Sequence, residues 1–207
     1  MQTVATKLFE YGQTEIDYLT NVDQTLGAVI KRMGRVEREV IPDLFTALVH
    51  AMVGQQISVK AAHTIWCRMQ ERFADITPQV IAAVTVETIQ QCGMTTRKAG
   101  YIKSIGETVT RGEINLAELY ELPDDTVIKR LSTLRGIGVW TAEMLLLNSL
   151  ERPNVVSWGD LAIQRGMINL YGLTGINKQQ FEQYKKRYSP YGSVASLYLW
   201  KLSAERR

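Results

Sequence analysis

An all-α fold is the prediction for this 207-residue chain, and three observations lead to it. Apolar residues recur at three- and four-residue spacing through most of the sequence, which is the period of an amphipathic helix. Start and stop signals for helices are frequent. The alternation of apolar and polar residues that is typical of strands is absent, and Val155–Val156 is too short a run to predict one. We therefore expect about ten or more short helices.

The helices can be justified in order along the chain. The first clear ones are predicted at 43–52 and 58–73, where apolar residues form one stripe with the helical period. Thr77 before Pro78 has the pattern of an N-cap followed by proline at the first helical position. Asn177, with a glutamine three residues later, resembles a capping box. Helix ends are predicted at three glycines that follow helical stretches: Gly93, Gly112 and Gly172.

Composition narrows the classes of protein. The net charge of +3 is compatible with an anionic partner but does not identify one. Only two cysteines are present, Cys67 and Cys92, so a disulfide framework, a zinc site or a four-cysteine iron–sulfur cluster is not expected. His50 and His63 lie on helical stripes and are predicted to be structural, which leaves no divalent-metal site. Because no membrane-spanning run or signal pattern is present, we expect a cytoplasmic protein.

The most informative segment is a predicted helical hairpin. Gly136 and Gly138 separate a helix that Asp124 or Asp125 can cap from a second helix that begins near Val139. Glycines let the backbone approach a ligand closely, and the unpaired N–H groups at a helix start suit a phosphate. Such a turn can grip a nucleic-acid backbone without reading its sequence. An ordinary glycine-capped turn is the alternative, but the full pattern Leu-x-x-Leu-x-Gly-Ile-Gly-x-x-Thr-Ala favours phosphate binding.

Asp160 opens a further predicted helix downstream of the hairpin. Taken alone, an aspartate in this place is most simply an N-cap. An ionised carboxylate can also stabilise positive charge that develops on a bound ligand. The two roles are compatible, because one oxygen can accept a backbone N–H while the other faces a ligand.

The hairpin, the short extended segment after it, and Asp160 followed by Arg165 together resemble the helix-hairpin-helix (HhH-GPD) base-excision DNA glycosylases. The resemblance extends from about Asp23 to about Lys201, although Ser-Trp-Gly precedes Asp160 where the family usually has a proline. It implies two helical lobes with a DNA cleft between them. The expected lobes are 41–150, ending in the hairpin, and 1–40 together with 151–207. Asp160 is then the expected catalytic residue, at their junction.

Within this superfamily the chain resembles the 3-methyladenine DNA glycosylase II branch in its compact form. Members that also cut DNA carry a lysine where this chain has Trp140, so water is the expected nucleophile. The implied substrates are alkylated purines of the 3-methyladenine and 7-methylguanine class, whose positive charge is attracted to an aromatic face. The branch often has a tyrosine at the position of Met144. The resemblance implies that Trp140 and Trp200 line the base pocket, with Met144 in place of the tyrosine. Trp158 either joins this pocket or only packs in the core.

The resemblance also implies how DNA would be held. Gln56, in Gly54-Gln-Gln-Ile-Ser58, is the expected wedge that fills the gap left by a flipped base, with a polar helix end as the alternative. The expected phosphate contacts are the amides of Gly136, Gly138 and Ala142. No cofactor is expected apart from a Na⁺ or K⁺ ion on the carbonyls of Ser132, Leu134 and Ile137. The partner is double-stranded DNA with damaged bases, bound by a monomer that is nucleoid-associated if the source is bacterial.

Three other interpretations stay open. A glycosylase of this fold could act on deaminated or mismatched bases, and Met144 keeps that alternative open. A non-catalytic DNA-binding module would carry the hairpin but would need neither Asp160 nor Trp140. A purely structural helical protein is the third alternative, and salt-dependent DNA binding would exclude it.

Overall fold

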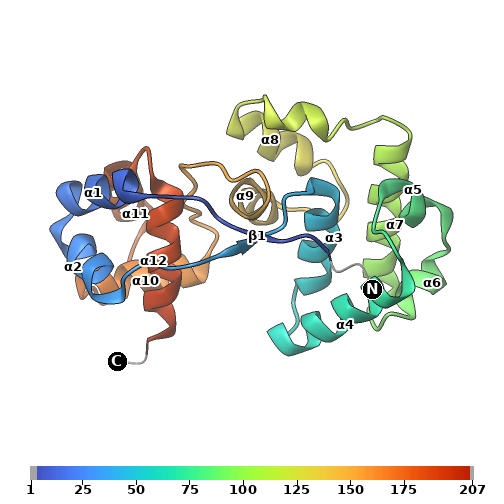
Figure 1. Ribbon diagram of the computed structural model, residues 1–207, viewed down its shortest axis with the longest axis horizontal. Helices are drawn as coiled ribbons and strands as arrows, with labels where there is room; N and C mark the ends of the chain where they lie inside the picture. The colour runs from blue at the N-terminus through green and yellow to red at the C-terminus, as the bar shows by residue number, and fades with distance from the viewer. Residues whose placement is uncertain (1–3, 206–207) are drawn as a thin grey trace. The chain divides into compact units, whose positions relative to one another are not determined.

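The computed structural model describes residues 4–205 (Figure 1). This part of the chain forms twelve α-helices, one short 3₁₀ helix and one two-stranded sheet, so the prediction of an all-α fold is confirmed. The two strands, β1 (Lys7–Leu8) and β2 (Glu39–Val40), have two residues each, which is too few for an alternating pattern to predict. Among the described helices, none has both the length and the apolar character needed to cross a membrane.

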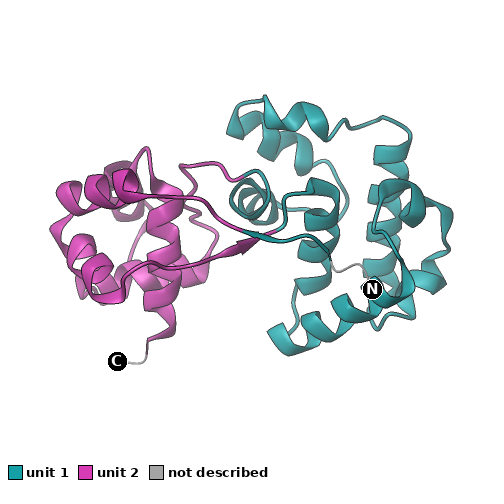
Figure 2. Cartoon of the chain, viewed as in Figure 1, with its two compact units in different colours: residues 1–7, 41–150 teal, residues 8–40, 151–207 magenta. Residues whose placement is uncertain are grey.

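The chain divides into two compact units (Figure 2). Unit 1 contains Ile41–Leu150 and the described residues up to Lys7, whereas the sequence grouped those first residues with the other lobe. Its helices are α3 (Leu44–Gly54), α4 (Val59–Arg72), α5 (Pro78–Ala83), α6 (Val86–Gln90), α7 (Thr96–Thr110), η1 (Ala117–Tyr120), α8 (Asp124–Leu131) and α9 (Val139–Asn148). Unit 2 contains Leu8–Val40 and the chain from Glu151 onward. Its helices are α1 (Gln13–Val22), α2 (Gln24–Met33), α10 (Leu161–Tyr171), α11 (Lys178–Tyr188) and α12 (Gly192–Ala204).

Side-chain caps explain where several helices begin. Asp43 accepts a hydrogen bond from the Thr46 amide at 2.7 Å at the start of α3. Thr77 caps α5 as predicted, with Pro78 at the first helical position, and Asn177 completes the predicted capping box of α11. The predicted cap of α8 is wrong, because Pro123 occupies the N-cap position. Both candidate aspartates lie in the first turn instead, where their charge favours the helix dipole: Asp124 and Asp125.

Each unit has its own apolar core. In unit 1, α3 is buried on nearly every side, and Leu48, Val49 and Met52 have no exposed surface. In unit 2, α10 packs against α12 so closely that a Cβ atom at Gly166 would lie 2.2 Å from the Leu199 carbonyl oxygen. No side chain larger than a hydrogen atom therefore fits at that crossing.

A buried carboxylate links three parts of unit 2. Asp23, at the start of α2, accepts hydrogen bonds from the Leu26 amide at 2.9 Å, the Tyr171 hydroxyl at 2.6 Å and the Arg187 guanidinium at 2.8 Å. Burial alone would raise the pKa of Asp23, but these three hydrogen bonds and the charge of Arg187 hold the pKa below its ordinary value. The ionised carboxylate is therefore the form that the fold stabilises.

Acid should remove this stabilisation. Because the pKa of Asp23 is lower in the folded than in the unfolded chain, its contribution is complete at neutral pH and is lost as the pH falls through the folded value. Asp23→Asn should lower the free energy of unfolding at pH 7 by about 3 kcal/mol and flatten its pH dependence below about pH 4. Urea unfolding at pH 7, 4 and 3 measures both effects. An unchanged slope in the acid range would mean that other groups carry the pH dependence.

Candidate functional site

The hairpin that connects α8 to α9 uses its two glycines for different reasons. Gly136 has a φ of 84°, and a Cβ atom there would lie 2.6 Å from Cδ2 of Tyr101 and 2.7 Å from Cε of Met52. Gly138 has an ordinary extended backbone, and a Cβ atom there would meet nothing within 4 Å. Ile137, between them, is buried, and its amide donates to the Leu134 carbonyl at 3.1 Å. The turn is thus fixed by Gly136 and Ile137, while Gly138 keeps the backbone accessible.

Accessible amides lie at the start of α9. The first hydrogen bond within this helix runs from the Ala142 amide to the Gly138 carbonyl at 3.0 Å, so the amides before Ala142 precede the helical ladder. Gly138 is exposed, and so is Val139, which has 58% of its surface exposed. Ala142 does not fit the role predicted for its amide, because it is buried and its N–H is already used. The Val139 amide, which sequence reasoning missed, is the better-placed donor.

Three residues of the same turn carry the carbonyls that are the predicted ligands of an alkali cation. Ser132, Leu134 and Ile137 lie between the end of α8 and the start of α9. The Leu134 carbonyl accepts one hydrogen bond and keeps a second lone pair, and the buried Ser132 hydroxyl oxygen has no hydrogen-bond partner among the described residues. Such neutral, hard oxygen atoms are the ligands that K⁺ takes from protein backbones.

The loop between α3 and α4 carries an exposed residue in a strained conformation. Gln56 has a φ of 57°, in the left-handed region that residues other than glycine rarely adopt. Its neighbour Ile57 is 38% exposed. Strain of this kind persists only where surrounding contacts impose it, and it is frequent where a side chain must project toward a ligand.

Two side chains that sequence reasoning missed hold this loop. The Lys98 ammonium, on α7, donates to the carbonyls of Val53 at 3.0 Å and Gln55 at 2.9 Å, and partial burial lowers the pKa of Lys98. The Gln55 amide nitrogen donates to the Gly136 carbonyl at 3.0 Å and to the Thr141 hydroxyl at 3.3 Å. The loop with Gln56 is therefore tied to the hairpin within unit 1.

In unit 2, Asp160 caps α10 and keeps one oxygen for a different partner. Its Oδ1 accepts from the amides of Ala162 at 2.8 Å and Ile163 at 3.0 Å. Its Oδ2 accepts from the indole nitrogen of Trp200, on α12, at 3.2 Å. The residue is 7% exposed, so the carboxylate is held on both sides in a largely buried position. The predicted helix cap is therefore present, and the second oxygen, which was expected to face a ligand, accepts a hydrogen bond from Trp200 in this structure.

Arg38 joins this arrangement, and no sequence pattern marked it. Its guanidinium carbon lies 4.9 Å from the centre of the Trp200 ring, a cation–π distance. Part of the side chain reaches solvent, but protein packed around the guanidinium lowers the pKa of Arg38, while the negative charge of Asp160 acts in the opposite direction. Unit 2 thus brings together a carboxylate, an indole and a guanidinium.

The side chains predicted to surround the base belong to both units. Trp140 lies in the first turn of α9 and is 44% exposed, with half-buried Met144 one turn later, both in unit 1. Trp158 and Trp200 belong to unit 2. The Trp158 ring packs edge-on against Phe181 at 5.1 Å, a contact typical of core packing.

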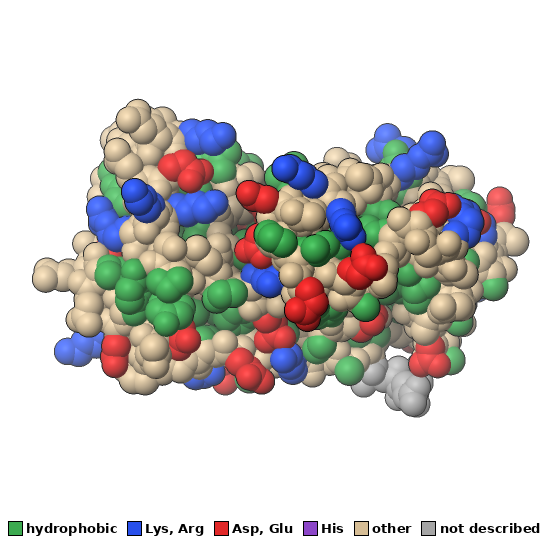
Figure 3. Space-filling view, turned by 90° about the horizontal axis from the view of Figure 1, so that it is seen from above, with side chains coloured by type: hydrophobic (Ala, Val, Ile, Leu, Met, Phe, Trp, Pro, Cys, Tyr) green, Lys and Arg blue, Asp and Glu red, His purple; other side chains and the backbone are tan. Residues whose placement is uncertain are grey.

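The described part of the chain offers few other candidate functional sites. No group of three or more His, Cys, Asp or Glu side chains there could hold a metal ion. His50 is exposed, and its ring lies edge-on to the Trp66 ring with the ring centres 4.8 Å apart. On the face drawn in Figure 3, Lys and Arg are scattered and mixed with Asp and Glu. The positive charge on that face is therefore not gathered into one patch.

Comparisons with known proteins identify the family of this chain. The profile of the HhH-GPD superfamily of base excision DNA repair proteins matches residues 49–190, which include the hairpin and Asp160. DNA-3-methyladenine glycosylase 1 of Schizosaccharomyces pombe is 33% identical over 198 residues, covering 90% of this chain and 85% of the relative.

Two solved structures share the fold over nearly the whole chain. A DNA-3-methyladenine glycosidase from Bacillus halodurans superposes with a TM-score of 0.83 at 35% identity, covering 96% of this chain and 93% of that one. The Schizosaccharomyces pombe 3-methyladenine DNA glycosylase in complex with abasic DNA superposes with a TM-score of 0.81 at 30% identity. This superposition covers 91% of this chain and 95% of that one. From the family profile and these relatives, the chain belongs to the HhH-GPD superfamily of base excision DNA repair proteins.

Proposed function

We propose that this protein is a monofunctional DNA glycosylase that hydrolyses the N-glycosidic bond of alkylated purines in base excision repair. The substrates are of the 3-methyladenine and 7-methylguanine class. The observation that carries the proposal is the geometry of Asp160, whose Oδ1 accepts two amides of α10 while Oδ2 accepts the Trp200 indole N–H. The relatives named as 3-methyladenine glycosylases support the choice of substrate class.

The chemistry needs a fixed negative charge beside a sugar. When the bond between C1′ and the base breaks, its electron pair leaves with the base and positive charge develops on the deoxyribose. The Asp160 carboxylate stabilises that charge, and water then adds to C1′ and loses a proton. Alkylation at N3 or N7 makes the purine cationic, so the base leaves as a neutral molecule. One carboxylate and water are sufficient, and we propose no cofactor for the chemical step.

Trp140 supports hydrolysis by water rather than a covalent route. At this position the superfamily members that also cut DNA carry a lysine, and an indole cannot form a Schiff base with the sugar. The exposed Trp140 ring instead offers an aromatic face to a cationic purine, with Met144 one turn away on the same helix.

Product analysis tests this function. The protein should release free base from methylated duplex DNA and leave intact abasic sites that are cut only by alkali. Borohydride should trap no covalent adduct between protein and DNA. A trapped adduct would contradict the assignment of water as the nucleophile, and strand cutting without alkali would contradict the monofunctional class.

For the DNA backbone, we propose that the exposed amides of Gly138 and Val139, with the positive end of the α9 dipole behind them, hold a phosphate. The Ser132, Leu134 and Ile137 carbonyls would bind a Na⁺ or K⁺ ion, which supplies positive charge near that phosphate. The protein is expected to act as an intracellular monomer on double-stranded DNA. Gln56 would fill the space left by the flipped base.

Lys98 should be needed to hold Gln56 in the position from which it enters the DNA. Lys98→Met removes the two hydrogen bonds that hold the end of α3 and should lower the free energy of unfolding by about 1–3 kcal/mol. It should also slow base release from duplex DNA, because Gln56 loses its fixed position. Urea unfolding and single-turnover kinetics measure the two effects.

Lys103 provides a matched control on the same helix. Its ammonium donates to the carbonyls of Ala82 and Val84, each at 2.9 Å, at the end of α5. Lys103→Met should lose comparable stability but release bases at the wild-type rate. Equal slowing in both variants would show that lost stability, rather than the wedge loop, explains the effect.

A further inference from the structure

We propose that Arg38 is a positioning residue for the catalytic carboxylate, because it holds the Trp200 ring so that the indole N–H keeps its hydrogen bond to Asp160. The proposal rests on the function proposed above and assigns a role to a residue outside the hairpin and the α10 cap. Three contacts within unit 2 carry it.

The first contact is the hydrogen bond to Oδ2 of Asp160, the carboxylate oxygen that α10 does not hold. The amides of Ala162 and Ile163 both donate to Oδ1 of Asp160, so α10 fixes that oxygen directly. Oδ2 receives the indole N–H of Trp200 at 3.2 Å. A carboxylate that must face a charged sugar needs both oxygens fixed, since catalysis by electrostatic stabilisation depends on groups oriented before the reaction.

The second contact sets the orientation of the indole. Trp200 lies near the end of α12 and is half-buried, unlike the residues Val194–Leu199 before it, which are buried in the core of unit 2. Its ring is covered on one face by the Arg38 guanidinium at 4.9 Å. A planar guanidinium stacked on an aromatic face is attracted by the ring and restricts its rotation.

The third contact anchors Arg38 itself. The segment between α2 and β2 pairs with the N-terminal strand segment, and the Phe9 amide donates to the Arg38 carbonyl at 2.8 Å. The backbone that carries the guanidinium is therefore fixed relative to the core of unit 2. The positive charge of Arg38 also attracts Asp160, which favours the conformation in which the guanidinium lies over the Trp200 ring.

This arrangement gives Trp200 a different role from the one that the sequence predicted. One face of its ring is occupied by a cation and its N–H is used by Asp160, so its main effect should be to orient the carboxylate rather than to attract a cationic base. Loss of the N–H should then slow the release of every base by a similar factor. A stacking role would instead change the preference among bases.

A double-mutant cycle tests the proposal. Arg38→Gln and Trp200→Phe are each expected to lower the single-turnover rate constant for release of 3-methyladenine and 7-methylguanine from methylated duplex DNA by roughly tenfold. The double variant should be no slower than Trp200→Phe alone, because without the indole N–H there is nothing left for Arg38 to position. Both products should slow alike.

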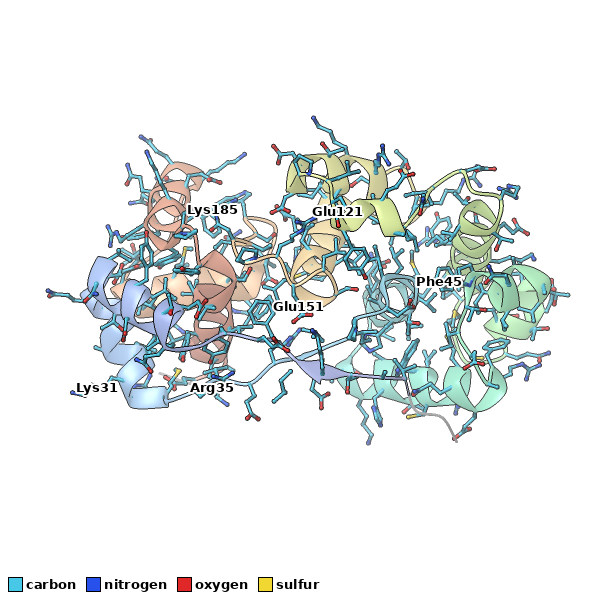
Figure 4. All side chains as sticks on the ribbon, turned by 45° about the horizontal axis from the view of Figure 1, so that its top comes forward. Lys31, Arg35, Phe45, Glu121, Glu151 and Lys185 are labelled. Carbon is cyan, nitrogen blue, oxygen red and sulfur yellow. The ribbon has the colours of Figure 1, made fainter. Side chains whose placement is uncertain are left out.

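Arg35→Gln is the matched control. Arg35 lies just beyond α2 (Figure 4), and its guanidinium covers the Tyr11 ring at 4.5 Å, the same kind of contact in the same segment. This variant should keep the wild-type rate constant. Multiplicative losses in the double variant would overturn the proposal. So would an Arg38→Gln variant that loses DNA affinity and salt dependence at an unchanged rate constant, since that result describes a phosphate ligand.

A measurement without substrate separates this proposal from the proposed function. In ¹⁵N-labelled protein, Arg38→Gln and Asp160→Asn should both move the indole N–H resonance of Trp200 and speed its exchange with solvent, while that of Trp66 stays in place. If the resonance moves but the wild type releases no methylated base, the positioning contact stands and the proposed function fails. An unmoved Trp200 resonance in Arg38→Gln would contradict the positioning role, whatever the activity.

Discussion

The Asp160→Asn variant is expected to bind duplex DNA as the wild type does but to release methylated bases about 10²- to 10³-fold more slowly. The amide has almost the same shape and is itself a good N-cap, so α10 should keep its start. It carries no charge to stabilise a cationic sugar, and its NH₂ group would face the Trp200 indole N–H in place of Oδ2. Single-turnover kinetics and fluorescence anisotropy measure rate and affinity separately.

Asp43→Asn provides the control for this substitution. Asp43 is also a capping carboxylate, and it accepts from the Thr46 amide at 2.7 Å at the start of α3. The same chemical change there should leave both base release and DNA affinity near wild type. Unchanged release in Asp160→Asn would refute the assignment of Asp160 as the catalytic residue. Equal loss in both variants would indicate a general effect on folding.

The Gly138→Leu variant is expected to weaken binding to every duplex, damaged or intact, by about tenfold or more, since charge-assisted hydrogen bonds to a phosphate are lost. The fold should tolerate the substitution, because the backbone is extended and a Cβ atom would meet nothing within 4 Å. The new side chain would stand beside the exposed amides of Gly138 and Val139 and keep a phosphate away. Binding to several duplexes of unrelated sequence measures the effect.

Gly136→Leu should differ from Gly138→Leu in its effect on the stability of the fold. Its φ of 84° strains any larger residue, and its Cβ atom would lie against Tyr101 and Met52, so we expect a loss of about 2–4 kcal/mol in the free energy of unfolding. Gly138→Leu should unfold like the wild type. If Gly138→Leu weakened binding to some sequences and not to others, the hairpin would be reading bases rather than gripping phosphates.

The parts of the molecule that could be predicted from the sequence depend on residues close together in the chain. The hairpin is predicted by Gly136 and Gly138, and the start of α10 is predicted by Asp160, which accepts from the amides of Ala162 and Ile163. The two strands escaped prediction because two-residue segments have no period. Ala142 was misassigned because the helical ladder begins at its own amide, so its N–H is no longer available.

The residues that were missed act across long stretches of chain. Lys98 donates to two carbonyls at the end of α3, Gln55 donates to the hairpin, and Arg38 lies over Trp200 from a different part of unit 2. A surface lysine, a polar helix end and an arginine in a loop all carry the same local pattern whether or not they have such partners. Only the packing of distant segments gives them a role, and no spacing in the sequence encodes it.

The most direct test of the proposed function is to incubate the wild-type protein with methylated duplex DNA and identify the free bases by chromatography and mass spectrometry. Free 3-methyladenine should appear, with 7-methylguanine, and alkali-labile abasic sites should accumulate in equal number. Binding of the DNA with no release of any methylated base would contradict the proposed function. The hairpin would then belong to a DNA-binding module or to a glycosylase for another class of lesion.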